Sequence, residues 1–219
     1  MTQQELEMRC GMEIYMIRHG VTEWNKLMRL QGQTDIPLED AGRELAVRVG
    51  HALKEIPFTR VISSPLQRAV ETAKLVIMAA GKAVEFQTDD RLKEISFGDW
   101  EGYSATNPDY PSPDPEFRNF FEHTELYHAP SGGESFEQLL ERTGDFLKEL
   151  ASRQEYENET ILVSVHGAVM RGLLANIKHS DLADFWGPGV PENCAVAIAR
   201  TQQGCWELIQ QDVIYLERR

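Results

Sequence analysis

The sequence predicts an α/β protein, a three-layer α/β/α sandwich with a mostly parallel central sheet and an antiparallel edge element. Short apolar runs rich in β-branched residues occur at residues 13–17, 60–63 and 160–165. Between them, apolar residues recur every three or four positions, which is the period of an amphipathic helix. Strands that alternate with helices favour a parallel sheet covered on both faces. Two extended runs, 194–200 and 205–211, predict a hairpin at one side of this sheet.

The first apolar run stops abruptly at the triplet Arg18-His19-Gly20. An apolar run that ends in charge is typical of a buried strand leaving the core, so the triplet is placed to meet a ligand. A helix is predicted next from apolar residues that share one face: Leu38, Ala41, Leu45, Val49 and Ala52.

Two later helices have marked starts. Ser64 to Gln67 offers a serine cap, a proline at the first helical position and a glutamine three residues after the serine. Ser135 to Gln138 repeats this capping-box spacing, and both patterns predict a helix N-terminus. The last predicted helix, at 168–177, follows the run 160–165 directly.

Residues 103–133 interrupt the alternation of strands and helices. They are expected to form a lid-like excursion from a single domain that spans residues 1–219. Residues 1–11 precede the first strand and are expected to be an N-terminal extension. Prolines exclude any helix in the excursion longer than 116–125: Pro108, Pro111, Pro113, Pro115 and Pro130.

The composition excludes several classes of protein. The chain is 42% hydrophobic and 26% charged, close to soluble globular averages. No apolar run is long enough to span a bilayer, and the N-terminus lacks the apolar core of a signal peptide, so a cytoplasmic protein is expected. A net charge of −13 argues against nucleic acid or an anionic membrane as partner. The oligomeric state stays open.

The three cysteines, Cys10, Cys194 and Cys205, include no CxxC pair. Their odd number and spacing favour reduced, structural cysteines over a disulfide framework or a zinc site. No cofactor is expected.

Two histidines end apolar runs in matched contexts. His19 and His166 each follow such a run, and a glycine follows each of them. In an open parallel sheet, ligands bind outside the carboxyl ends of the strands, so the two histidines are predicted to share one crevice. A helix that starts directly after His166 would also direct backbone N–H groups at a phosphate there.

Two other interpretations of these histidines stay open at this point. A lone histidine at a strand end is more often a satisfied polar residue than a catalyst, although two in matched contexts favour a site. A zinc site from His19, His166 and a carboxylate is conceivable. No HxxxH or HxH spacing supports it, so no metal is expected.

Five motifs follow one another along nearly the whole chain: IRHGVTEWN, QGQTDIPLEDAGRELA, SSPLQRAVETA, LKEISFGDWEG and VSVHG. In this order they resemble the histidine phosphatase superfamily, which includes cofactor-dependent phosphoglycerate mutases and many small phosphatases. The chain is most similar in appearance to the small broad-specificity and alpha-ribazole-type phosphatases. The resemblance implies the phosphoglycerate mutase-like fold.

The resemblance also implies a role for individual residues. His19 would attack phosphorus and carry a phosphohistidine, and Glu94 would act as general acid and base. Arg18, Arg68, His166 and Asn25 would form a clamp on the phosphoryl oxygens. Three residues would line the substrate side: Gln31, Gly32 and Gly167. Because guanidinium contacts are fork-shaped, lysine at position 18 or 68 should be poorly tolerated.

Periodicity alone gives a different interpretation of two of these residues. Arg68 falls opposite the apolar stripe of its helix, which is typical of a solvated arginine, although its first-turn position lets it lean toward the strand ends. Glu94 stands in a segment with several other acids and would by itself be taken for a surface glutamate. Only the resemblance places both in the site.

Three functions are compatible with the motifs. Residues 103–133 contain one arginine, Arg118, and no lysine, whereas a phosphoglycerate mutase needs cations there for the carboxylate of its substrate. A phosphomonoester hydrolase acting on a small phosphorylated metabolite is therefore favoured over a cofactor-dependent phosphoglycerate mutase. A catalytically inactive phosphate-binding domain is the third candidate, and the intact motif residues argue against it.

Overall fold

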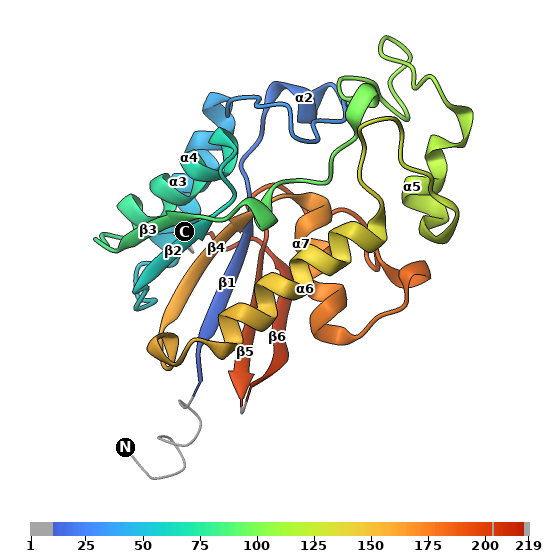
Figure 1. The fold of residues 1–219 in the computed structure, drawn as a ribbon. Helices are drawn as coiled ribbons and strands as arrows, with labels where there is room; N and C mark the ends of the chain where they lie inside the picture. Colours follow the sequence, from blue (N-terminus) through green and yellow to red (C-terminus); the bar gives the residue numbers. More distant parts are fainter. Residues whose placement is uncertain (1–10, 203, 217–219) are drawn as a thin grey trace.

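The computed structural model describes residues 11–202 and 204–216. Its strands are β1 (Glu13–Arg18), β2 (Arg60–Ser63), β3 (Glu85–Thr88), β4 (Thr160–Val165), β5 (Val196–Gln202) and β6 (Cys205–Val213). They form a six-stranded sheet in the order β3-β2-β4-β1-β5-β6 (Figure 1). The first four strands pair in parallel, while β5 is antiparallel to β1 and β6 is antiparallel to β5. The predicted mostly parallel sheet with an antiparallel edge element is confirmed.

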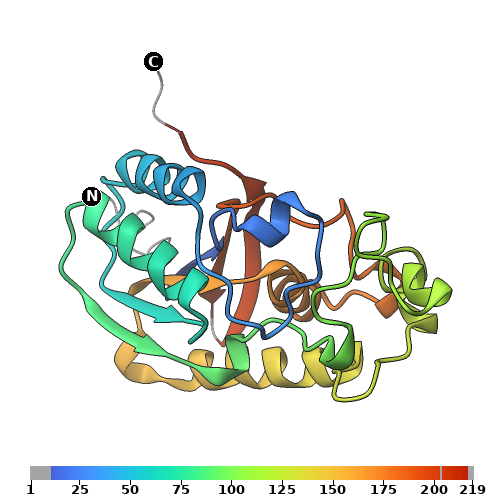
Figure 2. The same cartoon turned by 90° about the horizontal axis from the view of Figure 1, so that it is seen from above.

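Helices cover both faces of this sheet. The longer ones are α3 (Asp40–Ala52), α4 (Gln67–Ala79), α6 (Phe136–Ser152) and α7 (Gly167–Lys178). Side chains of β1 alternate between the faces: Tyr15 and Ile17 belong to the core under α3 and α4, whereas Ile14 and Met16 belong to the core under α6 and α7. Figure 2 shows the sheet between these two helical layers. The predicted three-layer sandwich is therefore confirmed.

Short helical segments complete the chain. Two are single-turn α-helices, α2 (Glu23–Lys26) and α5 (Asn119–Glu122). The others are 3₁₀ turns at Asp90–Leu92, Gly98–Trp100, Pro115–Arg118, Thr124–Leu126, Gln154–Tyr156 and Leu182–Asp184. No helix in the described part of the chain is long and apolar enough to cross a bilayer.

The strand β3 was not predicted. All four of its residues are exposed, and it pairs only with β2 at the edge of the sheet. A strand without a buried face has no alternation of apolar and polar residues, so the pattern that marks half-buried strands is absent.

One of the two predicted helix starts is confirmed. The Ser135 side chain accepts a hydrogen bond from Gln138 N, and the Gln138 side chain accepts one from Ser135 N, which is a full capping box at α6. The start at Ser64 is wrong, because α4 begins at Gln67 after Leu66 and has no side-chain cap. The Ser64 hydroxyl instead contacts His166.

Residues 103–133 lie outside the sheet, and no single helix spans 116–125. Short turns and α5 replace it, and they lie at the upper right of Figure 1. Phe117 and Phe120 are buried, with the ring of Phe120 stacked 5.0 Å from Phe136 of α6. Aromatic packing against α6 therefore fixes the excursion to the body of the protein.

The two described cysteines differ in exposure. Cys194 is buried and Cys205 is exposed, and neither forms a disulfide within the described residues. The structural role expected for the cysteines thus fits Cys194 and not Cys205. Cys10 and the rest of the expected extension, apart from Gly11, lie outside the described residues.

Candidate active site

The two histidines predicted to share a crevice are neighbours. His19 follows β1 and His166 follows β4, and these strands are adjacent, parallel and in register, with Arg18 opposite Val165. The backbone N–H of His19 donates to Val165 O at 3.0 Å. The two imidazole centroids lie 5.2 Å apart. The sheet register itself thus brings the two rings together.

His19 is held in one tautomer. The side chain is 3% exposed, and its Nδ1 lies 2.7 Å from the carbonyl oxygen of Gly20. A carbonyl only accepts hydrogen bonds, so Nδ1 carries the proton and Nε2 keeps its lone pair. Burial, together with the Arg68 and Arg18 guanidiniums, holds the pKa of His19 well below its usual range. The ring is therefore neutral at pH 7, as a nucleophile must be.

His166 is held in the opposite tautomer. Its Nδ1 receives the Nε–H of Arg68 at 3.2 Å, and its Nε2 lies 2.7 Å from the Ser64 hydroxyl oxygen. Since arginine only donates, Nδ1 is the unprotonated nitrogen and Nε2–H donates to Ser64. Burial, followed by Arg68 and His19, lowers the pKa of His166 well below its usual range. Both imidazoles are uncharged in this arrangement.

Arg68 is fully buried, so the interpretation as a solvated arginine is wrong. It lies in the first turn of α4, from which long side chains lean toward the helix N-terminus and over the strand ends. Its Nη1 donates to Thr34 O at 2.8 Å and its Nη2 to Gly32 O at 2.7 Å. Burial lowers its pKa to about 10, which leaves the guanidinium charged at neutral pH.

Arg18 ends β1 and points into the same site. Its Nη1 donates to the carbonyl of Pro191, and its buried Nε has no partner within the described residues. Burial lowers its pKa, while the nearby Glu94 carboxylate acts in the opposite direction. An unpartnered charged donor at this position is available to an anionic ligand.

Glu94 is bound to the start of α7. Its Oε1 accepts from Ile95 N at 2.9 Å and from Val169 N at 3.2 Å, and its Oε2 accepts from Ala168 N at 3.2 Å. The sequence predicted that these helix N–H groups face a phosphate. For Ala168 and Val169 this is wrong, because the carboxylate already satisfies the positive end of the helix.

Asn25, predicted in the clamp, lines one cavity with His19 and with the three residues predicted on the substrate side, Gln31, Gly32 and Gly167. His166, also predicted in the clamp, is not among the residues that line this cavity. Asn25 Oδ1 accepts from the backbone and hydroxyl of Thr22, so its amide nitrogen faces away from those contacts. Gln31 is 8% exposed, and its Oε1 is buried without a partner in the described chain. A Cβ at Gly167 would lie 3.2 Å from Val190 Cγ1, which is a tight approach, and 3.7 Å from Arg18 Nε, which is an ordinary contact.

The cavity has a volume of about 440 Å³ and a polar and an apolar part. Arg18, His19, Arg68 and Glu94 form the polar part. The apolar part comes from several segments of the chain: Met28, Leu30, Phe97, Ala105, Phe120, Phe121, Trp186 and Val190. Phe120 and Phe121 belong to the excursion, so this segment contributes a wall of the cavity.

Arg29 also lines the cavity, and the sequence did not predict it. Its guanidinium carbon lies 4.0 Å from the ring centroid of Trp24 and 4.3 Å from that of Tyr110, and its Nε donates to Gly102 O at 2.6 Å. The Trp24 ring thus supports a cation at the cavity. No spacing signal marks Arg29, because its ring partner Tyr110 lies about eighty residues away in the chain.

A second unpredicted contribution comes from the loop before β5. Trp186 and Val190 line the cavity, and Asn193 Nδ2 donates to His19 O at 2.9 Å. Gly187 and Gly189 have φ values of +50° and +101°. The Gly-Pro-Gly sequence was the available signal, since such a cluster marks a loop with special backbone geometry.

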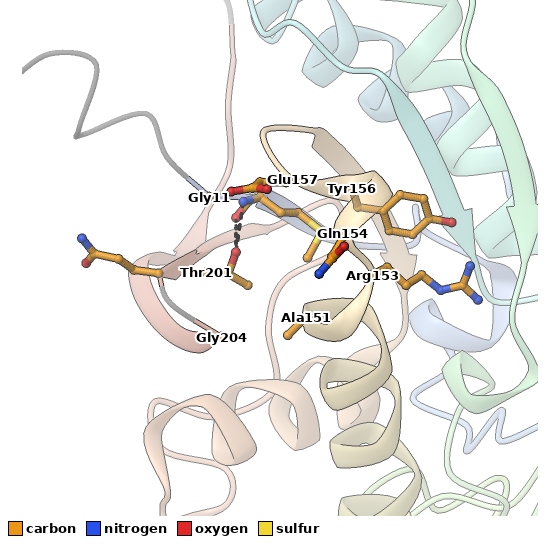
Figure 3. A pocket seen from close by; sticks show the side chains of 10 residues that line it. Gly11, Ala151, Arg153, Gln154, Tyr156, Glu157, Thr201 and Gly204 are labelled. Carbon is orange, nitrogen blue, oxygen red and sulfur yellow. Dashed lines mark hydrogen bonds between the residues drawn. The ribbon is translucent and has the colours of Figure 1, made fainter. Parts of the chain in front are cut away.

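A cavity of about 530 Å³ lies elsewhere, near the start of β1 (Figure 3). Its lining includes Gly11, Ala151, Tyr156 and Thr201, all labelled in Figure 3. Met12 N donates to the Thr201 hydroxyl at 3.0 Å. Arg18 and His19 lie at the other end of β1, and none of the predicted site residues lines this cavity.

A covered α/β sheet with two uncharged histidines, two guanidiniums and a carboxylate beside adjacent strand ends defines a protein with a histidine phosphatase-type site. The chain belongs to the histidine phosphatase superfamily (branch 1), whose family model matches residues 14–213. The resemblance stated from the motifs is confirmed.

Individual relatives agree with this family. Phosphoglycerate mutase-like protein 4 of Arabidopsis thaliana is 36% identical over 77% of this chain and 72% of its own length. The metal-independent phosphoserine phosphatase of the same plant is 33% identical over 78% of this chain and 71% of its own. The solved structure of Bacillus stearothermophilus YhfR is similar with a TM-score of 0.84 and 33% identity, over 94% of this chain and 100% of that one. The family and its phosphatase-named relatives support phosphatase activity.

Proposed function

We propose that this protein hydrolyses phosphate monoesters of small metabolites through a phosphohistidine formed on Nε2 of His19, without a metal ion. The observation that carries the proposal is the state of His19. Its Nδ1–H is fixed by Gly20 O, and its pKa is held well below the usual range. A free Nε2 lone pair beside two guanidiniums suits attack on a phosphorus atom.

The reaction needs two displacements. In the first, which begins with Glu94 protonated, Nε2 of His19 forms a bond to phosphorus, the P–O bond to the leaving group breaks, and Glu94 gives its proton to the leaving oxygen. In the second, Glu94 takes a proton from water, whose oxygen attacks phosphorus and displaces His19 as phosphate leaves. The proton taken from water replaces the one given up, so the cycle restores Glu94.

The groups around His19 would stabilise the negative charge on the phosphoryl oxygens in the transition state. The unpartnered Nε–H of Arg18 and the Arg68 N–H groups not committed to Gly32, Thr34 and His166 would bind the equatorial oxygens. The amide nitrogens of Asn25 and Gln31 would add neutral donors. Loss of one such preorganised donor typically costs about 10²–10³ in rate.

The cavity also limits the kind of leaving group. Its apolar wall, with Met28, Phe121 and Trp186, suits a leaving group with an apolar part. Among the described residues that line the cavity, Arg29 is the one arginine besides Arg18 and Arg68, and it favours a second anionic group, and therefore phosphoglycerate mutase activity or a phosphoserine-like substrate. Arg118, the single arginine of the excursion, does not line this cavity, so hydrolysis remains the favoured activity.

The test is turnover of p-nitrophenyl phosphate and of phosphoserine in excess EDTA. We expect hydrolysis by the wild type, loss of it in His19→Ala, and an acid-labile phosphoryl group on His19 after rapid quenching. Turnover that needs an added metal, or that His19→Ala retains, would contradict the proposal.

Two further assays separate the alternatives. Interconversion of 3- and 2-phosphoglycerate that depends on 2,3-bisphosphoglycerate would identify a mutase instead. Binding of inorganic phosphate with neither activity would identify a non-catalytic phosphate-binding domain.

A further inference from the structure

The loop of residues 30–35 lies between two charged side chains. On one side, Gln33 N and Thr34 N each donate to the Glu101 carboxylate at 2.8 Å, and the Thr34 hydroxyl donates to it as well. On the other side, Gly32 O and Thr34 O accept from the Arg68 guanidinium at 2.7 and 2.8 Å. The loop is therefore fixed by a carboxylate through its N–H groups and by a guanidinium through its carbonyls.

One peptide unit connects the two charges directly. The carbonyl of the Gly32–Gln33 peptide accepts from Arg68, and the N–H of the same peptide donates to Glu101. The C=O and N–H of a trans peptide point in opposite directions, so the peptide dipole is aligned with both charges. Such a chain of charge-assisted hydrogen bonds is stronger and more directional than neutral ones.

We propose that Glu101 is a positioning residue, which holds the Arg68 guanidinium in its phosphate-binding orientation through the Gly32–Gln33 peptide. This inference rests on the proposed function, because it takes Arg68 as a phosphate ligand. Contacts to Gly32, Thr34 and His166 commit three of the five N–H groups of Arg68. The guanidinium is planar and rigid, so these three contacts also fix the direction of its other two N–H groups.

The space around Gly32 supports this role. Gly32 has a φ of +50°, and a Cβ built on it would lie 2.1 Å from Glu101 Oε1. Any side chain at position 32 would thus displace the carboxylate from the loop. The backbone at this position and the carboxylate form one close-packed unit.

The charge of Glu101 also reaches Arg68. Burial lowers the pKa of Arg68 to about 10, and the carboxylates of Glu94, Asp35 and Glu101 oppose that effect. Glu101 therefore both orients the buried guanidinium and helps to keep it protonated.

The test compares Glu101→Gln with Asp99→Asn. Both changes remove one negative charge from the same segment, but Asp99 is exposed and its side chain has no hydrogen bond within the described residues. In Glu101→Gln, the amide NH₂ replaces one carboxylate oxygen and faces a backbone N–H of the loop. Two donors cannot hydrogen-bond to each other, so one of the hydrogen bonds from the loop to residue 101 is lost. We expect Glu101→Gln to lower kcat/KM for p-nitrophenyl phosphate and the affinity for inorganic phosphate by about tenfold to a hundredfold. Asp99→Asn should change each by about twofold or less.

A double-mutant cycle separates positioning from general destabilisation. In an Arg68→Met background, Glu101→Gln should cost only about twofold more, because its effect acts through Arg68. If the two substitutions act independently, so that their fold losses in kcat/KM multiply in the double variant, the inference is overturned. If Glu101→Gln does not fold, Thr34→Val removes only the hydroxyl contact to Glu101 and should give a loss of about threefold to tenfold.

The outcomes distinguish this inference from the proposed function. If the wild type is active and Glu101→Gln has the same kcat/KM and phosphate affinity as Asp99→Asn, the positioning role is overturned and the phosphatase proposal stays intact. A wild type that binds inorganic phosphate but hydrolyses no monoester overturns the proposed function, and the phosphate affinities of the same variants still decide the role of Glu101. A wild type with neither property overturns both.

Discussion

The protonation state of His19 is decided by its immediate neighbours. Its pKa is held low first by burial and then by Arg68 and Arg18, while the hydrogen bond to Gly20 O acts in the opposite direction. Because a lowered pKa keeps the imidazole neutral as the pH falls, Nε2 should stay available well below pH 6.5, the ordinary midpoint for histidine. The nucleophile is thus prepared by burial and by the same cations that would bind the phosphate.

This state can be measured directly. We expect ¹⁵N NMR of the imidazole nitrogens to show His19 titrating well below pH 6.5, and Arg68→Met to raise its midpoint because one cation is removed. A His19 midpoint near 6.5, or one unchanged by Arg68→Met, would show that the neighbours do not set its charge.

Not every site residue could be found from the sequence in the same way. His19 and His166 were predictable because each ends an apolar run, and strand ends of a parallel sheet meet at one edge. Arg68 carried the opposite signal, since its helical position faces away from the apolar stripe, and only the motif placed it correctly. Arg29 had no local signal, and the Gly-Pro-Gly sequence marked only the loop of Asn193 and not its contact, because the partners of both residues come from distant segments that meet only in the folded chain.

At the scale of elements, two serines with the same sequence pattern have different tasks. Ser135 caps α6, whereas Ser64 lies two residues before the N-cap of α4 and holds Nε2 of His166. The Ser64 oxygen also accepts from Leu66 N at 3.3 Å. The S-x-x-Q pattern predicted both as caps, because it reports local backbone preference and not a tertiary partner.

Alanine at Ser135 should therefore lower stability, whereas alanine at Ser64 should lower activity. Ser135→Ala should lower the free energy of unfolding by about 1 kcal/mol, the usual value of a lost N-cap, and leave kcat/KM for p-nitrophenyl phosphate unchanged. Ser64→Ala leaves a buried His166 N–H without an acceptor, so it should lower kcat/KM by about tenfold as the ring loses its fixed orientation. Urea unfolding and steady-state kinetics on both variants measure this. Wild-type kcat/KM in Ser64→Ala would contradict the assigned contact.

The helices and strands that could be predicted from the sequence are those with at least one buried face. β1, β4 and α6 have strong patterns because one or both of their faces are buried. β3 is exposed at all four residues and was missed. The excursion was located by its prolines, but its short turns were not, since aromatic packing against α6 decides their shape.

At the scale of the whole molecule, the site places two neutral histidines inside the folded core. Unfolding exposes both, and their pKa values then return to about 6.5. Below that pH the unfolded chain binds protons that the folded chain excludes, so the stability of the fold falls as the pH decreases. Carboxylates with lowered pKa values, such as Asp89 and Glu149, lose their contributions only at more acidic pH. The two histidines therefore dominate between about pH 6.5 and pH 4.5.

Acid sensitivity of stability is the expected consequence. In phosphate-free buffer, the free energy of unfolding should fall by up to about 1.4 kcal/mol per pH unit for each of His19 and His166 in this window. His19→Gln should reduce the slope by about half. Urea titrations at several pH values measure the slopes. Equal slopes in wild type and His19→Gln would mean that His19 accepts a proton in the folded state, and the neutral nucleophile on which the proposed reaction depends would then be lost in mild acid.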